Sequence, residues 1–325
     1  LKKKYVMSKT FIDKLPFDLK KYNIKKIETG ASTKIIYKIF LDKKSFIGID
    51  FNLNNNDYDK YLYIHDILSK INISIPKIIN KDNKNLLIIS EDFGSLRYDK
   101  ILKKQSIKSL LQYSVDTLLE LNKNIVFDNS LKISKYNRDI FKSEIEELPN
   151  FYFKYIKLDD KRLLLKKEFI DIWMSSYNLI DFDFKNFCHK DFNLNNLIFL
   201  PSRSTHLKCG VIDFQDAFWG ESCWDLFSLL EDSRVSFSNK YNEEMIEYFY
   251  LNTNQKITLH DYKLKYHFLN CSRQTRLLGR WVKLAKKSNI ISYLDFIYVT
   301  KKRLKSSLFF LQNKELNEFY NDYIL

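Results

Sequence analysis

The sequence predicts an α+β protein, in which a small N-terminal lobe built on an antiparallel sheet precedes a larger, mostly helical C-terminal lobe. Three observations support this prediction. Short runs rich in β-branched and aromatic residues gather in the first third of the chain, amphipathic helical patterns fill most of the remainder, and one irregular polar section, 187–232, interrupts those helices. We therefore expect lobes over residues 1–93 and 94–325.

The first lobe begins with a predicted β-hairpin. The runs 35–40 and 45–50 are rich in strand-forming residues and are separated by four turn-like residues. Residues 58–71 carry apolar side chains at helical spacing, and 86–89 is a short apolar run typical of a buried strand. Gly94 follows that strand and is a candidate hinge.

The second lobe is predicted to be helical. The first of its helices is amphipathic, with leucines and a valine near one face. The expected helices cover 106–122, 161–177, 242–250, 260–284 and 291–311, and a short apolar one 226–230. Two short apolar strands, 197–200 and 209–212, lie inside the polar section, where most of the residues suited to chemistry are found.

Composition limits the class of protein. The chain has 325 residues, 45% hydrophobic, with only 6 Gly and 4 Pro, so it is globular and has few flexible linkers. The net charge of +14 comes from lysines spread along the chain. This charge fits a solvated basic surface, and attraction for phosphorylated or nucleic-acid ligands stays open. No secretory signal and no apolar run of the roughly 20 residues a membrane helix needs are found, so we expect a cytoplasmic protein.

The four cysteines do not form a metal-binding pattern. No C-x-x-C pair is present, and Cys188 beside His189 lacks a second pair at a suitable spacing. We expect four reduced, mostly buried thiols.

The strongest chemical feature is the run HKDFNLNN at 189–196. It places the carboxylate of Asp191 and the carboxamide of Asn196 on one short loop before a strand. Phosphoryl transfer needs such a division, because one group orients the attacking oxygen while oxygen ligands hold the magnesium that bridges the phosphates. His189 is assigned a packing and hydrogen-bonding role.

Two further acids follow the second strand of this section. Asp213 comes directly after apolar strand residues, where a ligand can reach it, and a carboxylate suits Mg²⁺. Asp225 opens an apolar helix, which it could cap while bracing the loop that holds Asp191. Each piece alone has an ordinary alternative, such as an N-cap or a surface acid. Their order and spacing together make the pattern specific.

This arrangement resembles the protein-kinase-like superfamily in its aminoglycoside and choline phosphotransferase branch. The segments IDFQDA (212–217) and DLFSLLED (225–232) further resemble the bacterial anomeric kinases, which phosphorylate N-acetylmuramate and N-acetylglucosamine at the C1 hydroxyl during cell-wall sugar recycling. The similarity extends to TGAS (29–32), LIISEDFG (87–94) and SRQTRLLG (272–279), and it is loose over about 123–183.

The resemblance implies a bilobal kinase fold, ATP and Mg²⁺ as cofactors, and a role for each motif residue. Asp191 would be the catalytic base, with Asn196 and Asp213 as magnesium ligands and His189 and Asp225 as structural support. Two further sets would contact ATP, the first over its phosphates and the second, through its backbone, beside the adenine: Gly30, Ala31 and Ser32, and Glu91, Asp92 and Phe93.

One departure from the kinase pattern concerns the phosphate-clamping lysine of the third strand. The run 45–50 contains no lysine. Lys34 or Lys38 could reach the phosphates, or both could be solvated strand charges.

Acceptor contacts are expected from residues beside the second motif and along one later helix. Arg273, Arg276 and Arg280 form a helical row that could bind an anionic sugar, such as one bearing a lactyl carboxylate, or could be an exposed basic stripe paired with nearby acids. Trp219 and Trp224 could stack on a sugar or pack in the core. The residues assigned to the acceptor are Gln215, Asp216, Trp219, Arg273 and Arg276.

We therefore expect a small-molecule kinase, most similar to a sugar 1-kinase acting on amino sugars. Choline, an aminoglycoside or a homoserine-like alcohol is the alternative acceptor, although the positive charge does not favour a cationic one. A catalytically inactive kinase-like binding module is the third reading, and the presence of Asp191, Asn196 and Asp213 argues against it. We expect a monomer whose partner is a small molecule, with neither a membrane nor a nucleic acid as partner.

Overall fold

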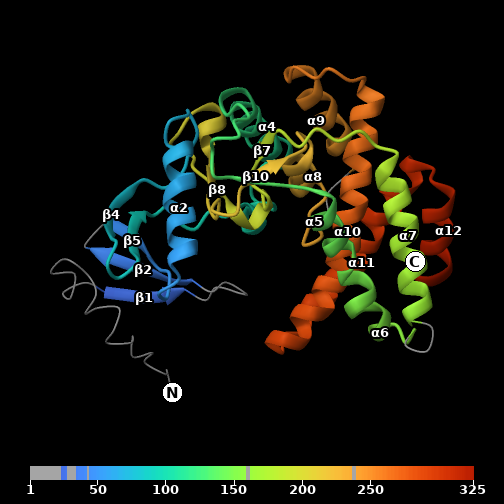
Figure 1. Ribbon diagram of the computed structural model, residues 1–325. Coiled ribbons are helices and arrows are strands. Elements are labelled where there is room, and N and C mark those ends of the chain that lie inside the picture. The colour runs from blue at the N-terminus through green and yellow to red at the C-terminus, as the bar shows by residue number, and fades with distance from the viewer. Residues whose placement is uncertain (1–22, 28–33, 42–43, 159–161, 236–238) are drawn as a thin grey trace.

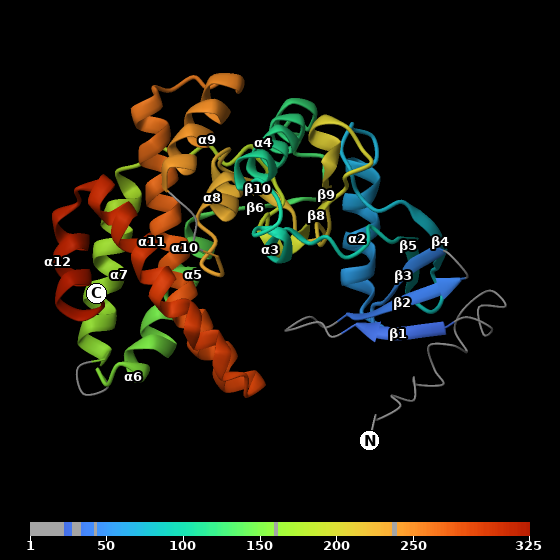
Figure 2. The same ribbon diagram turned by 180° about the vertical axis from the view of Figure 1, so that it is seen from behind.

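The computed structural model describes residues 23–27, 34–41, 44–158, 162–235 and 239–325. A sheet with one long helix occupies one end of the molecule, and a group of helices occupies the other end (Figure 1). The same arrangement is seen from behind in Figure 2. The predicted α+β class, with a small N-terminal antiparallel sheet and a mostly helical C-terminal part, is thus confirmed.

The sheet contains five antiparallel strands in the spatial order β1-β2-β3-β5-β4. Their bounds are Asn23–Ile27 (β1), Ile35–Leu41 (β2), Lys44–Asp50 (β3), Ile78–Asp82 (β4) and Leu87–Glu91 (β5). The predicted hairpin is β2–β3, and the predicted third strand is β5. The strands that the sequence did not reveal, β1 and β4, lie at the two edges of the sheet. Their lysines and asparagines weaken the apolar signal, as is common in edge strands.

Side chains alternate between the two faces of the sheet. Ile49 and Ile88 belong to the main core, together with buried residues of α2 (Asn55–Leu68), whereas Leu87 and Ile89 pack in a small cluster on the other face. The predicted helix 58–71 begins three residues earlier in the structure because Asn54 caps it. The Asn54 side-chain oxygen accepts a hydrogen bond from the backbone N of Asp57 at 3.1 Å.

The C-terminal part is helical, and its predicted helices are confirmed with shifted ends. The helix predicted over 291–311 is a 3₁₀ turn, Ile291–Asp295, followed by α11. The sequence did not predict the helices that are short or polar. The helices are Tyr98–Ile101 (α3), Ile107–Asn124 (α4), Arg138–Ile145 (α5), Phe153–Tyr155 (α6), Arg162–Asn178 (α7), Trp224–Leu230 (α8), Asn239–Asn252 (α9), Leu259–Ser288 (α10), Phe296–Leu311 (α11) and Lys314–Tyr323 (α12).

Helix α10 forms the centre of this part. It packs against α5, α8, α9 and α11, and more than half of its residues are buried. In Figures 1 and 2, α11 runs beside it, and α7 and α12 lie together at the far end. None of the helices within the described residues combines the length and apolar character needed to cross a membrane.

Short strands frame the polar section between α7 and α8. Strands β6 (Ser134–Lys135), β10 (Phe218–Gly220) and β7 (Asn186–Cys188) form a three-stranded sheet in that spatial order. The two short strands predicted over 197–200 and 209–212 are present as β8 (Leu197–Phe199) and β9 (Cys209–Val211), and the structure pairs them antiparallel. Each polar loop of the section therefore starts and ends on a fixed backbone.

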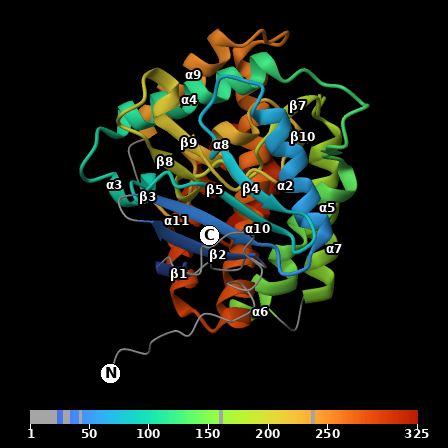
Figure 3. The same ribbon diagram turned by 90° about the vertical axis from the view of Figure 1, so that its left-hand side faces the viewer.

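The sheet and the polar section are joined by direct contacts. Ser74 Oγ donates a hydrogen bond to the carbonyl of Leu207 at 2.6 Å, and the ring of Phe214 lies 5.0 Å from that of Tyr61 on α2. Figure 3, viewed from the sheet end, shows the sheet in front of α10 and the other C-terminal helices. The two predicted lobes therefore meet beside the residues of the polar section.

Candidate active site

The loop that carries Asp191 is fixed by hydrogen bonds to its own backbone. The carbonyl of Asp191 accepts from the backbone N of Asn193 at 2.8 Å and from Asn196 Nδ2 at 2.9 Å. Lys190, just before, has φ of +82°, a conformation rare for a residue with a side chain. Because its Nδ2 faces the Asp191 carbonyl, the Asn196 side chain has its oxygen available for another ligand.

His189 connects this loop to the end of β9. The residue is buried, and its Nε2 lies 3.0 Å from the carbonyl of Ile212, which can only accept, so Nε2 carries the proton. Burial lowers the pKa of His189, opposed by the charges of Asp213 and Asp191. The imidazole is therefore neutral, and both acids are near enough for their charges to act on it.

Asp225 braces the loop from the other side. Its buried carboxylate accepts hydrogen bonds from the backbone N of His189 at 2.6 Å and of Lys190 at 3.0 Å. Burial raises the pKa of Asp225 to about 7, although the two bonds oppose this rise. The predicted helix cap is wrong, because Cys223 is the N-cap residue of α8 and makes no side-chain cap. The contact with the loop is as expected.

Asp213 faces a lysine from the sheet. Asp213 has φ of +66°, and its Oδ1 accepts a hydrogen bond from Lys34 Nζ at 2.9 Å. Desolvation opposes ionisation, but the Lys34 ammonium outweighs it and lowers the pKa of Asp213. The carboxylate is therefore ionised and half exposed, next to a cation that the sequence offered only as one of two candidates.

The other candidate lysine is engaged at the hinge. Lys38 Nζ lies 2.8 Å from Asp92 Oδ2, and Ser45 Oγ donates to the same oxygen at 2.6 Å. Burial alone would raise the pKa of Asp92. The hydrogen bonds from Lys38 and Ser45 help to outweigh this effect, so the pKa lies below its ordinary value. Lys38 is therefore held at the buried Asp92 carboxylate, whereas Lys34 lies at Asp213.

The remaining hinge side chains join the two lobes. Glu91 Oε1 accepts from Arg203 Nη2 at 2.9 Å, and the Arg203 guanidinium lies over the ring of Phe93, 4.9 Å from its centroid. Phe93 also packs with Ile198 and Leu200. The side chains are thus used within the protein, and contact of the backbone at Glu91, Asp92 and Phe93 with the adenine stays a prediction. Gly30, Ala31 and Ser32 lie outside the described residues.

The aromatic candidates for sugar stacking are in the core. Trp219 is only 2% exposed and packs against Phe127, with ring centroids 5.1 Å apart. Trp224 is equally buried, and its Nε1 donates to the carbonyl of Lys190 at 3.3 Å. The expectation that Trp219 contacts the acceptor is therefore corrected to core packing, since β10 is covered on both faces. Trp224 instead supports the loop.

Gln215 and Asp216 lie together after Asp213. Gln215 Nε2 donates to Asp216 Oδ2 at 3.2 Å, and Gln215 also interacts with Asp213. Gln215 is buried, whereas Asp216 is exposed. Their position beside Asp213 keeps them as candidates for acceptor binding.

Sequence reasoning missed a second brace of the loop. Arg234 Nη1 donates to Asn193 Oδ1 at 3.2 Å, and Arg234 Nε donates to Asp232 Oδ1 at 3.0 Å. These residues follow the DLFSLLE run, but no motif pairs them with a loop 40 residues earlier. Only the path of the chain after α8 reveals the contact.

The cysteine prediction is confirmed for all four residues. Each is a buried free thiol. Burial raises the pKa of Cys188, so this thiol stays protonated beside His189.

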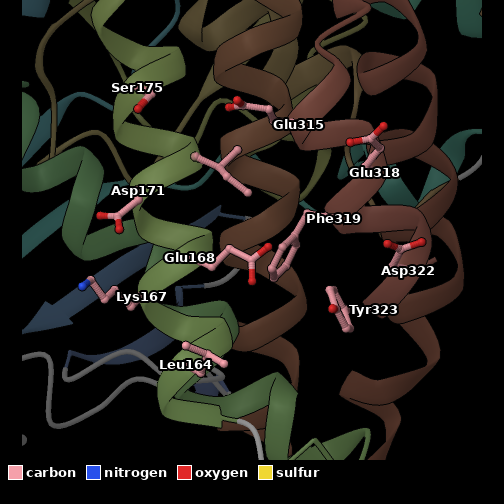
Figure 4. Close-up of a pocket in the computed structure, with 11 residues that line it drawn as sticks. Leu164, Lys167, Glu168, Asp171, Ser175, Glu315, Glu318, Phe319, Asp322 and Tyr323 are labelled. Carbon is pink, nitrogen blue, oxygen red and sulfur yellow. The ribbon is translucent and has the colours of Figure 1, made fainter.

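A separate groove lies between α7 and α12, away from this loop (Figure 4). Its volume is about 760 Å³, and acidic side chains dominate its lining: Glu168, Asp171, Glu315, Glu318 and Asp322. None of the residues discussed above lines it. The groove is a charged surface between two outer helices and plays no part in the candidate site.

The donor set around Asp213 fits a magnesium ion. Among residues 23–325 outside the undescribed gaps, no three His, Cys, Asp or Glu side chains gather as a metal site. Magnesium, however, is commonly held by one or two protein oxygens together with phosphate oxygens and water. The ionised Asp213 and the oriented carboxamide of Asn196 match that requirement.

Three comparisons with known proteins agree with this geometry. Residues 181–255 match the model of the phosphotransferase enzyme family. An N-acetylmuramate/N-acetylglucosamine kinase of Caulobacter vibrioides is 28% identical over 239 residues, covering 69% of this chain and 63% of that protein. The match thus spans less than two thirds of the relative's length.

Solved structures share the fold. The choline kinase LicA from Streptococcus pneumoniae has a TM-score of 0.61 at 16% identity, covering 87% of this chain and 93% of the other. The ADP-bound aminoglycoside phosphotransferase APH(2″)-Ib has a TM-score of 0.56 at 17% identity, with 87% and 95% covered. Residues 181–255, which carry the candidate site, thus match the phosphotransferase enzyme family model, and the chain shares the fold of these solved phosphotransferases.

Proposed function

We propose that this protein is an ATP- and Mg²⁺-dependent kinase that phosphorylates the anomeric hydroxyl of an N-acetylated amino sugar. The family match over 181–255 supports phosphoryl transfer to a hydroxyl group. The name of the Caulobacter vibrioides relative supports an amino-sugar acceptor. The observation that carries the proposal is the hydrogen bond from His189, two residues before Asp191, to the carbonyl of Ile212, the residue before Asp213, because it ties the segments of the two acids together.

In this mechanism each part of the loop has a separate task. Asp191 orients the acceptor hydroxyl and receives its proton, while Asn196 and Asp213 hold the cation. When bound, Mg²⁺ neutralises charge on the phosphate oxygens. Lys34 would turn from Asp213 to the phosphates as nucleotide and cation arrive, which would fill the place of the absent third-strand lysine.

This proposal predicts an anomeric sugar phosphate as product. Purified protein with ATP, Mg²⁺ and N-acetylmuramate or N-acetylglucosamine should yield a sugar 1-phosphate, detected by phosphorus NMR and distinguished from a 6-phosphate by its coupling to the anomeric proton. Omission of Mg²⁺ should abolish the product, because Asn196 and Asp213 carry no positive charge and only the cation they would hold can neutralise the phosphate oxygens.

Parallel reactions with choline and kanamycin separate the alternatives. Turnover of either one without turnover of the sugars would replace the proposed acceptor but keep the fold and chemistry. A protein that binds ATP and transfers phosphate to no acceptor would favour the inactive binding module. The cytoplasmic location, the monomeric state, the role in cell-wall sugar recycling and the lobe boundary at residues 93 and 94 stay predictions.

The variant Asp213→Asn tests the cation site. In the wild type, ATP with Mg²⁺ should raise the melting temperature more than ATP with EDTA, since a ligand that binds only the folded state stabilises it. We expect Asp213→Asn to lose most of this Mg²⁺-dependent increment, because a neutral amide attracts the cation less. Asp99→Asn is the matched control, an acid paired with Arg97 at 2.6 Å on α3. An undiminished increment in Asp213→Asn would contradict the assignment.

A further inference from the structure

The three arginines in a row on α10 have different environments. Arg280 makes two hydrogen bonds to Glu147, at 2.7 and 2.6 Å, and Arg276 pairs with Glu144. Arg273 is only 3% exposed, and its Nε and Nη1 have no hydrogen-bond partner among the described residues. The row is therefore not a basic surface stripe, and one of its members is a buried guanidinium with unused donors.

A series of hydrogen bonds links this part of α10 to the loop that carries Asp191. Gln274, the neighbour of Arg273, donates to the carbonyl of Glu231 at 3.0 Å and accepts from Ser233 Oγ at 2.9 Å. The same segment continues to Arg234, which donates to Asn193 in the loop at 3.2 Å. Arg273 therefore lies on the part of α10 that these bonds link to the loop that holds Asp191. Figure 1 shows α8, which precedes this segment, beside α10.

Electrostatics supports that position. Burial, with the charge of Arg276, lowers the pKa of Arg273 to about 10, although Asp232 and Asp191 oppose this fall. The charge of Asp191 also raises the pKa of Arg276. The charge of Asp191 thus acts on two arginines of the helical part, whereas Asp213 is paired with Lys34 beside the sheet.

A buried guanidinium with two donors left without hydrogen bonds is costly, so those donors need an explanation. Buried polar groups are nearly always hydrogen-bonded, and one that is not calls for a specific cause, such as a functional role. The guanidinium fork matches a carboxylate with two parallel hydrogen bonds. On the Asp191 side of the site, the molecule that must enter is the acceptor.

We propose that Arg273 binds a carboxylate of the acceptor, so that the substrate is an anionic amino sugar. This inference rests on the proposed function. Of the two sugars in the name of the relative, N-acetylmuramate carries a lactyl carboxylate and N-acetylglucosamine carries none. Arg273 is thus the residue that separates them, with Arg276 adding positive charge beside it.

The first test needs no variant. The wild type is assayed with N-acetylmuramate, with its neutral methyl ester and with N-acetylglucosamine. We expect kcat/KM for the free acid to exceed that for the ester about 10- to 100-fold, as for a hydrogen bond to a charged group. Because the ester keeps the size of the lactyl group, equal values would overturn the proposal.

The second test compares variants of the protein. Arg273→Gln should reduce the ratio of kcat/KM for N-acetylmuramate over N-acetylglucosamine by about 10- to 100-fold, mainly through KM, and Arg273→Lys should reduce it less, because it keeps the charge but loses the fork. Arg280→Gln is the control on the same helix and should leave the ratio unchanged. A ratio that survives Arg273→Gln would mean that Arg273 is satisfied by water alone, and it would overturn the inference while both sugars are still phosphorylated. If neither sugar is phosphorylated, the proposed function itself fails.

Discussion

The variant Asp191→Asn is expected to lose about a thousandfold in kcat, within the range that a positioned general base contributes. ATP binding should be largely unchanged. The reason is that the amide still orients the acceptor hydroxyl but takes no proton from it. In the proposed mechanism Asp191 serves the acceptor, whereas Asp213, which Lys34 contacts, serves the cation and the nucleotide.

The structure makes this substitution a clean one. The bonds from Asn193 and Asn196 that hold the loop go to the main-chain carbonyl of Asp191, not to its carboxylate. Asp225 holds the preceding residues through their backbone N atoms. Removal of the Asp191 charge should therefore leave the loop in place, and a loss of activity would report chemistry rather than disorder.

Single-turnover phosphorylation with ATP and Mg²⁺ present in excess measures this step directly, and the thermal shift on adding ATP measures binding. Asp183→Asn is the matched control, an exposed acid eight residues earlier that pairs with Lys185 at 2.9 Å. Its rate should equal that of the wild type. Asp191→Asn and Asp213→Asn should also differ from each other, the first in transfer and the second in nucleotide binding. Identical phenotypes would contradict the division of roles.

The parts of the site that could be predicted are those that lie close together in sequence. Asp191 and Asn196 share a loop of eight residues, and Asp213 follows the second of the two strands after that loop, so their order predicts a meeting point. The contact of Lys34 with Asp213 joins residues 179 positions apart. A solvated lysine and a phosphate-binding lysine have the same sequence pattern, and only the approach of β2 to the end of β9 distinguishes them.

Burial could not be predicted for the aromatic and cationic candidates. Trp219 lies in a polar section, yet β10 is the middle strand of its small sheet and is covered by Phe127 and Phe187. Arg273, Arg276 and Arg280 are alike in the sequence. The two acids that neutralise Arg276 and Arg280 come from the region of the chain with the loosest family resemblance. The distinct state of Arg273 therefore appears only in three dimensions.

That same region meets α10 at Gly279, where the two backbones come unusually close. A Cβ added at Gly279 would overlap the carbonyl of Glu147 and approach the backbone N of Leu148 to 2.8 Å. Leu148 begins the π-helical turn Leu148–Tyr152. Neither neighbour is the end of a flexible side chain, so one backbone must move.

Gly279→Ala should therefore destabilise the protein by about 2–3 kcal/mol, the range for overpacking in a dense interior, although alanine in an open helix position would stabilise it by about 1 kcal/mol. Urea unfolding followed by circular dichroism measures the change. Asn289→Gly is the control, because it removes a side chain where α10 ends with φ of +55°, a conformation that glycine adopts freely. Its effect should stay within about 0.5 kcal/mol. The displaced backbone also leads to Glu144, which pairs with Arg276 beside Arg273. The folded fraction of Gly279→Ala should thus lose acceptor affinity before it loses ATP binding, and unchanged stability would mean that α10 and the turn after α5 are not in contact at this glycine.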